Sequence, residues 1–311
     1  MGGPGEEICE TSARTSKMGN PLARASYYYR RRRATGVRAV LLRGLPRPAR
    51  RGLKFLIQVS LDGFDWLRGR RGEMVPPHRL NFAGDGDFEA TGDEFLGYFL
   101  ELGCLKPEHR VLEIGCGIGR MARPLTKYLT TGSYEGIDIV PRGVKWCTEE
   151  ISARHPRFVF RLADIRNDLF NPKGRTHPSE YVFPFGEGEF DFVFLTSVFT
   201  HMLRAELVQY LREITRTLKP GGRCLATFFL LNPESRSLIH SGSSSLNFRF
   251  VRSGCWTNDE GLPESAVAYE ESDILAECQK VRLGVETIRY GSWCGRANYL
   301  SYQDILVAKK A

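Results

Sequence analysis

The chain has 311 residues and is 42% hydrophobic, which is enough to bury the core of one large domain or two small ones. It contains no run of about eighteen apolar residues, so we expect no membrane-spanning helix. The net charge of +8 is uneven: residues 1–80 hold 17 Lys/Arg and 6 Asp/Glu, whereas residues 81–311 hold 27 and 30. The slightly acidic remainder argues against nucleic acid as the main substrate.

The cysteines and histidines do not have the spacing of a metal site. Eight cysteines form no C-x-x-C pair, and six histidines form no H-E-x-x-H motif. We therefore expect reduced, structural cysteines in a cytoplasmic protein and no metal ion.

The first 52 residues are rich in Gly, Pro, Ser and Arg, and we predict a basic, disordered N-terminal extension there. Arg30–Arg33 directly follow Tyr27–Tyr29, and no acidic residue occurs between Thr11 and Leu61. Four interpretations stay open: a solvated tail, an over-long start with Met18 as the true initiator, an organelle transit peptide, or a peripheral anchor that contacts an anionic membrane or phosphate groups.

Residues 53–105 are predicted to be a helical or lid-forming segment. Apolar residues cluster from Leu53 to Trp66, and Phe95 to Leu102 follow helical spacing. Between them, residues 81–88 form an acidic, aromatic loop. It is either a cover for a ligand or a plain linker.

Residues 111–129 predict a strand, a glycine-rich turn and a helix. Val111, Leu112 and Ile114 form an apolar run, the glycines 115, 117 and 119 follow, and Met121, Leu125 and Leu129 have helical spacing. Glycines permit a tight turn, and the free N–H groups of the new helix point toward a ligand.

A dinucleotide would be a poor ligand for this turn. The glycines run G-x-G-x-G, whereas the dinucleotide fingerprint is G-x-G-x-x-G, whose last position here is Arg120. Glu113 would also repel a pyrophosphate. A carboxylate suits a ligand with a cationic end, such as S-adenosylmethionine (SAM).

Further strands and helices alternate after this turn. Strands are predicted at residues 132–138, 158–163, 189–196 and 223–230, with helices at 141–154 and around 207–218. A helix at 272–278 and strands at 281–290 and 302–308 complete the series. Residues 166–188 form a long loop, and residues 231–268 an insertion. Such alternation predicts a parallel sheet with helices on both faces.

The motifs VLEIGCGIGR, YEGIDI, LADI, FDFVFLTSVFTHM and EITRTLKPGGRCLATFF, in this order, resemble those of class I SAM-dependent methyltransferases. The middle of the chain also resembles bacterial methyltransferases that modify small molecules and glycans. The resemblance implies an α/β, Rossmann-like domain over residues 106–311. Its seven-stranded sheet would be mainly parallel, with the last strand antiparallel.

The resemblance also implies SAM as cofactor, bound across the strand ends. Asp138 would accept the ribose hydroxyls, Asp164 would meet the adenine amino group, and Ile165 would lie against the ring. The full set of expected cofactor-binding residues is Glu113, Gly115, Cys116, Gly117, Gly119, Asp138, Ile139, Asp164, Ile165 and Thr196.

His201 is the candidate general base, because it follows the fourth strand and its unperturbed pKa lies near 6.5. The alternative is a histidine that only orients its loop. Asp304 and Arg296 are weaker catalytic candidates. Trp256, Trp293 and Arg296 fall in segments expected at the substrate rim, although each could equally be a packing residue.

The acceptor is predicted to be a hydroxyl of a small molecule or glycan. The N-methylation pattern [DN]-P-P-[YFW] is absent after the fourth strand, where Thr196 is followed by Ser197, Val198 and Phe199. Two other functions stay open: an NAD-type oxidoreductase, and a non-catalytic SAM-fold protein whose tail binds a membrane or nucleic acid.

Overall fold

The computed structural model describes residues 47–69, 71–82 and 86–311. The predicted disorder of the N-terminal extension therefore concerns residues that lie mostly outside the described part. The chain divides into two compact units, residues 1–44 and 45–311, and only the second is described below.

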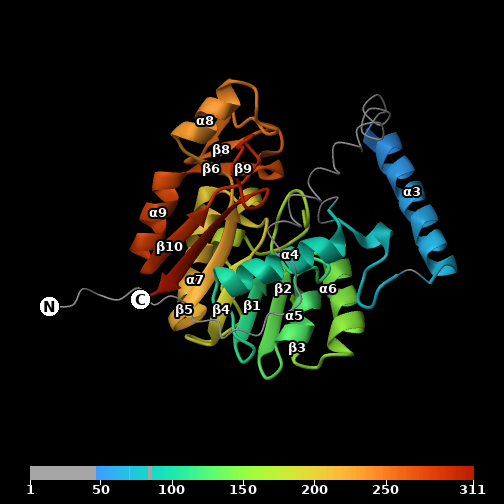
Figure 1. Cartoon of the computed structure of the whole chain (residues 1–311). Helices are drawn as coiled ribbons and strands as arrows, with labels where there is room; N and C mark the ends of the chain where they lie inside the picture. Colours follow the sequence, from blue (N-terminus) through green and yellow to red (C-terminus); the bar gives the residue numbers. More distant parts are fainter. Residues whose placement is uncertain (1–46, 70, 83–85) are drawn as a thin grey trace. The chain divides into compact units, whose positions relative to one another are not determined.

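A seven-stranded sheet forms the centre of this unit, with the strand order β10-β11-β5-β4-β1-β2-β3 (Figure 1). The five strands from β5 to β3 are parallel, and β11 is antiparallel to both of its neighbours. The prediction of a mainly parallel, Rossmann-like sheet with an antiparallel last strand is confirmed. The strands are β1 (Arg110–Ile114), β2 (Ser133–Asp138), β3 (Phe158–Leu162), β4 (Phe190–Leu195), β5 (Leu218–Phe228), β10 (Leu283–Arg289) and β11 (Asp304–Lys310).

Helices cover both faces of the sheet because apolar side chains of successive strand residues point to opposite sides. On one face, α7 (Arg204–Thr217) and α9 (Glu271–Lys280) pack on residues such as Leu112 and Val193. On the other face, α4 (Phe88–Glu101), α5 (Ala122–Tyr128) and α6 (Pro141–Cys147) pack on residues such as Val111 and Phe192.

The fifth strand and the helix after β2 differ from the sequence prediction. The fifth strand was expected at 223–230, but β5 begins at Leu218, which pairs with Phe190. The register then shifts at Pro220–Gly222, where Gly221 has a positive φ, so the glycines form an irregularity within the strand. The helix expected at 141–154 is α6 followed by a π-helical turn, Thr148–Ser152.

The 231–268 insertion forms most of a second, four-stranded sheet with the order β6-β9-β8-β7. Its short strands are β6 (Leu230–Leu231), β7 (Phe250–Arg252), β8 (Cys255–Thr257) and β9 (Val267–Glu270), and α8 (Pro233–His240) follows β6. A third apolar cluster, which includes Phe229, Phe248 and Trp293, packs beneath it.

Helix α3 spans Arg47–Leu67 and begins inside the segment that the sequence assigned to the extension. Its Asp62 carboxylate is buried and accepts the backbone N–H of His78 at 2.6 Å, which ties the helix to the segment that follows. Among the described residues, no helix has the length and apolarity that a membrane crossing requires.

Candidate active site at the carboxyl ends of the strands

The glycine-rich turn after β1 lies against the turn after β4. Gly115 has a φ of 78°, and a Cβ at this position would lie 2.4 Å from Cγ2 of Val198. Gly119 has a φ of 74°, and a Cβ there would lie 2.5 Å from Cδ1 of Ile151. Only glycine fits these two positions, so the turn can follow its tight path beside the neighbouring segments.

Asp138 fastens the end of β2 to the glycine turn. Its Oδ2 accepts the backbone N–H of Gly117 at 2.7 Å, and its Oδ1 accepts that of Val140 at 2.7 Å. Burial raises the pKa of Asp138, and these backbone donors oppose the rise. A carboxylate has about four acceptor positions, so ribose hydroxyls can still donate to Asp138.

Glu113 lies deeper than the sequence suggested. Glu113 is the second-to-last residue of β1. Its side chain is buried and accepts a hydrogen bond from the hydroxyl of Tyr134 on β2. Burial raises the pKa of Glu113 to about 8; the Tyr134 hydrogen bond lowers it, and the charge of Asp138 raises it. Glycine at position 136 leaves room for this hydrogen bond, because a Cβ at that position would lie 2.9 Å from the hydroxyl oxygen of Tyr134.

Asp164, at the end of β3, is paired with a residue of the long loop. Arg175 donates to its carboxylate through both the guanidinium and the backbone N–H, and the pairing lowers the pKa of Asp164. Ile165 is buried, and its backbone bridges to Thr176. The adenine contacts expected of Asp164 and Ile165 remain predictions.

The two buried carboxyls suit a cationic ligand. Within residues 47–69, 71–82 and 86–311, neither Glu113 nor Asp138 has an ion-pair partner. Burial raises the pKa of both carboxyl groups, so it disfavours their ionised forms. A positive charge nearby would favour the ionised forms. The sulfonium and ammonium groups of SAM carry such charge, so the residues at these strand ends fit that cofactor.

Two aromatic residues from the N-terminal segment reach the same region. The guanidinium of Arg142 lies 5.1 Å from the ring centroid of Phe82, and that of Arg120 lies 5.9 Å from the ring of Phe88. A Cβ on Gly143 would lie 3.0 Å from the Phe82 ring. Phe82 and Phe88 thus lie near the glycine turn. Residues 83–85 lie outside the described part, and both the cover and the linker interpretation of this loop stay predictions.

His201 lies where three segments of the expected substrate rim meet. Its Nδ1 lies 2.8 Å from the carbonyl oxygen of Glu264, in the insertion, and its ring packs edge-on against Phe170, in the long loop, at 5.5 Å. A carbonyl can only accept, so Nδ1 carries the proton and Nε2 keeps a lone pair. Burial lowers the pKa of His201, which favours this neutral form.

Ser197 is a rim residue that the sequence did not single out. It follows Thr196 at the end of β4, is exposed, and has a φ of 60°, which is unusual for serine. Its N–H donates to the Thr227 hydroxyl at 2.7 Å, and the Gln303 amide donates to its Oγ at 2.9 Å. Backbone strain of this kind gathers at functional sites, but no sequence pattern indicates it here.

Asp304 and Arg296 are structural residues and not part of the catalytic rim. The Asp304 carboxylate is 0% exposed and accepts from Arg296 Nη1 at 3.1 Å, Trp293 Nε1 at 2.8 Å, and two backbone N–H groups. Arg296 also donates to Glu234 at 2.7 Å. Both Trp293 and Arg296 are buried, which favours the packing alternative for them.

Trp256, the third rim candidate, is partly buried, and the Arg236 guanidinium lies 4.7 Å from its ring centroid. No group of His, Cys, Asp or Glu within the described ranges is arranged to hold a metal ion.

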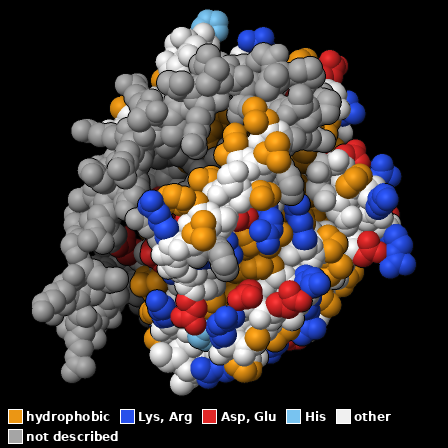
Figure 2. Space-filling model, turned by 90° about the vertical axis from the view of Figure 1, so that its right-hand side faces the viewer, with side chains coloured by type: hydrophobic (Ala, Val, Ile, Leu, Met, Phe, Trp, Pro, Cys, Tyr) orange, Lys and Arg blue, Asp and Glu red, His pale blue; other side chains and the backbone are white. Residues whose placement is uncertain are grey.

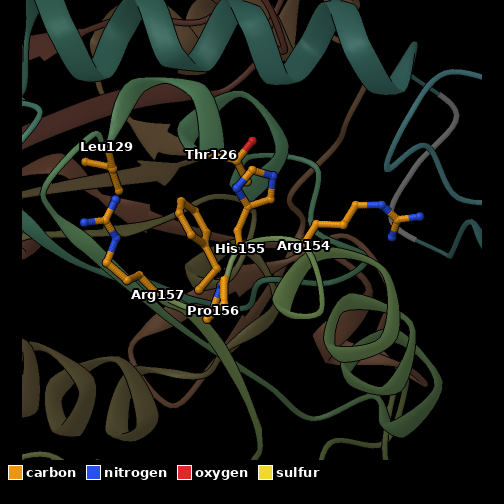
Figure 3. A pocket seen from close by; sticks show the side chains of 7 residues that line it. Thr126, Leu129, Arg154, His155, Pro156 and Arg157 are labelled. Atoms are coloured by element: carbon orange, nitrogen blue, oxygen red, sulfur yellow. The ribbon is translucent and has the colours of Figure 1, made fainter.

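A separate hollow of about 230 Å³ lies at the opposite, amino end of β3. Figure 3 shows the side chains of Arg154, His155 and Arg157 around it. Arg154 is engaged by the Glu150 carboxylate at 2.9 Å, and Arg157 donates to the Thr130 carbonyl. Ligands of open α/β sheets bind at the carboxyl ends of the strands, so this hollow is not the candidate active site.

Comparison with known proteins agrees with this geometry. Residues 112–226 match the family model described as "Methyltransferase domain". A curated relative is the phthiotriol/phenolphthiotriol dimycocerosates methyltransferase of Mycobacterium leprae (strain TN), with 33% identity over 116 residues, 36% of this chain and 35% of the relative. Phosphoethanolamine N-methyltransferase 2 of Caenorhabditis elegans is 25% identical over 171 residues, 55% of this chain and 32% of the relative. The chain thus spans about a third of the length of these relatives.

A solved structure with a similar fold is the PH0226 protein of Pyrococcus horikoshii OT3. It is 15% identical, the alignment covers 75% of this chain and 95% of that one, and the TM-score is 0.52. Such a low identity shows the fold alone. Residues 112–226 thus match a methyltransferase domain, and the strand order and the motif series support its class I, SAM-dependent type.

Proposed function

We propose that the protein transfers the methyl group of SAM to a hydroxyl of a small molecule, with lipid-like molecules and glycans as the first acceptor classes to test. The observation that carries the hydroxyl assignment is the 2.8 Å distance between Nδ1 of His201 and the carbonyl oxygen of Glu264. Because a carbonyl only accepts, we assign the proton to Nδ1, which leaves Nε2 as a base. Among the described residues, Nε2 has no hydrogen-bond partner.

The cofactor is assigned to the ends of β1 and β2. Asp138 would receive the ribose hydroxyls, and Glu113 would face the cationic end. Bound SAM supplies an electrophilic methyl carbon on a sulfonium, so the chain mainly positions and activates the acceptor. Correct positioning alone contributes about 7–11 kcal/mol to such reactions.

His201 removes the proton from the acceptor hydroxyl as the oxygen attacks. With SAM bound, the transfer would join the acceptor oxygen to the methyl carbon and break the bond between that carbon and sulfur, and the proton would stay on Nε2 of His201. Ser197 lies just after β4, and Gln303 lies just before β11. We assign both side chains to orienting the acceptor.

The names of the relatives support this acceptor class. The mycobacterial proteins are named as methyltransferases of phthiotriol and phenolphthiotriol dimycocerosates. The nematode protein is named as a phosphoethanolamine N-methyltransferase, so an amine acceptor is the alternative that the acceptor screen must include.

The protein is proposed to act in the cytoplasm. All seven cysteines in the described ranges are free thiols, and most are buried. Such usage is typical of a reducing compartment.

Calorimetric titration with SAM, S-adenosylhomocysteine and NAD tests the cofactor assignment. We expect the first two to bind and NAD not to bind. Asp138→Ala should abolish SAM binding, whereas Glu101→Ala, which removes an exposed carboxylate at the end of α4, should leave it unchanged. Binding of NAD alone would move the function to redox chemistry.

A further inference from the structure

Helix α3 carries a stripe of exposed apolar side chains. Each of these side chains lies three, four or seven residues from another one, so all five share one side of the helix: Leu53, Leu56, Ile57, Phe64 and Leu67. Their exposed fractions range from 37% to 76%. We call these five residues the α3 stripe. Figure 2 shows solvent-exposed hydrophobic side chains (orange) next to Lys and Arg side chains (blue) on the face that it views.

The helix is attached to its neighbours through its polar side. Asp62 is 4% exposed, accepts the backbone N–H of His78 at 2.6 Å, and lies 3.3 Å from the Arg79 guanidinium and 3.6 Å from that of Arg71. Asp65 lies 3.0 Å from Nε2 of His78. An amphipathic helix of a globular protein normally buries its apolar face, whereas in α3 the five apolar side chains of the stripe are exposed and Asp62 is buried.

The sequence of the helix that carries the stripe is basic at its start. Arg47, Arg50, Arg51 and Lys54 stand in the first eight residues of α3, and residues 11–61 contain no Asp or Glu. The Arg68 guanidinium, just after the helix, lies 3.9 Å from the ring centroid of Phe64 in the stripe. An apolar stripe with cationic flanks matches a surface that is both apolar and anionic.

We propose that the α3 stripe docks on the surface of an anionic lipid bilayer, with the helix lying in the plane of the interface. The apolar side chains would enter the boundary between headgroups and acyl chains, and the basic residues would meet lipid phosphates. A crossing orientation is not proposed, because no described helix is long and apolar enough for one.

Charge favours a lipid surface over a second copy of the chain. The two acids of α3, Asp62 and Asp65, are already engaged by residues 71–79, so the helix offers no unengaged carboxylate to the arginines of another copy. Lipid phosphates supply the missing anions. This inference is independent of the proposed methyl transfer, because it concerns binding to a surface and not chemistry.

Vesicle sedimentation with the full chain tests the proposal. The protein should bind vesicles of phosphatidylcholine with phosphatidylglycerol and should bind vesicles of phosphatidylcholine alone much less. Leu56→Gln/Leu67→Gln should weaken binding about tenfold or more, because two apolar groups no longer enter the bilayer. Both side chains are already exposed, so the variant should fold, and unchanged calorimetric SAM binding would show that it does.

A matched control uses the same substitution elsewhere. Leu162→Gln/Leu275→Gln changes two exposed leucines, on β3 and α9, that are 52% and 38% exposed. This variant should bind the anionic vesicles like the unmodified protein. Equal binding by the stripe variant would contradict the proposal and assign the contact to the basic tail. A dimer that the stripe variant converts to a monomer, without vesicle binding, would contradict it in favour of a second copy.

Discussion

The hydroxyl of Tyr134 on β2 donates a hydrogen bond to the carboxyl group of Glu113 on β1, between two parallel strands and out of contact with water. The carboxyl that is expected to face the cationic cofactor is therefore buried with a neutral partner. Burial raises the pKa of Glu113 to about 8, so without cofactor the carboxyl is mostly protonated at neutral pH. A cationic group bound beside it would lower this pKa and favour the carboxylate.

The first prediction concerns stability against pH without cofactor. The folded-state pKa of Glu113 is about 8 and its ordinary value is 4.5, so between these values the folded chain holds one proton more than the unfolded chain. The stability that this group contributes is full below pH 4.5 and is lost as pH rises toward 8, by roughly 1.4 kcal/mol per pH unit. Glu113→Gln removes this loss.

Chemical denaturation from pH 5 to pH 9 measures the effect. The free energy of unfolding of Glu113→Gln, relative to the unmodified protein, should rise up to about pH 8 and then level off. Glu260→Gln, which changes an exposed carboxyl, is the control and should show no such trend. A pH-independent difference for Glu113→Gln would show that Glu113 ionises normally in the folded chain.

The second prediction concerns His201. Because burial lowers its pKa, the base should already be neutral at pH 7, and kcat/KM should fall only on the acid side, below the usual histidine range. His201→Ala should lower kcat by about 10²–10⁴ with SAM affinity unchanged. His155→Ala, at the hollow beside β3, is the matched control and should retain activity. An active His201→Ala variant would remove His201 from the mechanism.

The third prediction uses the contact between Gly115 and Val198. Gly115→Ala should weaken SAM binding at least tenfold, because the new Cβ meets Val198 Cγ2 at 2.4 Å and the φ is positive. Adding Val198→Ala removes the contacting methyl group and should restore part of the affinity. Gly97→Ala, which meets nothing within 4 Å, should change nothing. Independent, additive effects of the first two substitutions would contradict the contact.

The fourth prediction tests the buried cluster of Asp304. Asp304→Asn removes the buried one of the two carboxylates that pair with the Arg296 guanidinium, leaving only the exposed Glu234, and should destabilise the fold by about 3–5 kcal/mol. Glu286→Gln breaks the more exposed pair with Arg223 and should cost about 0–1 kcal/mol. Denaturant unfolding of the two variants measures both values. If both variants lose a similarly small free energy of unfolding, the Asp304 cluster does not stabilise the fold as predicted.

The sequence predicts the central sheet well because its signals are local. The apolar run before Gly115, the acids Asp138 and Asp164 after the next strands, and the alternation with helices each lie within short segments. Parallel strands in one sheet then bring their carboxyl ends to the same edge.

The remainder depends on contacts between distant residues. Asp304 has the appearance of a catalytic acid until its donors, Leu230 N–H, Gly291 N–H and Trp293, are placed around it by the fold. The second sheet has strands of only two to four residues, too short for a clear alternation. The left-handed Ser197 and the buried Tyr134–Glu113 bond likewise have no local signal.

The most direct test of the central claim is transfer of a labelled methyl group from SAM to a panel of hydroxylated lipids, sugars and matched amines, with His201→Ala and His155→Ala in parallel. We predict label on a hydroxyl oxygen with the unmodified protein and His155→Ala, and about 10²–10⁴-fold less with His201→Ala. Label on an amine, or equal transfer by His201→Ala, would contradict it.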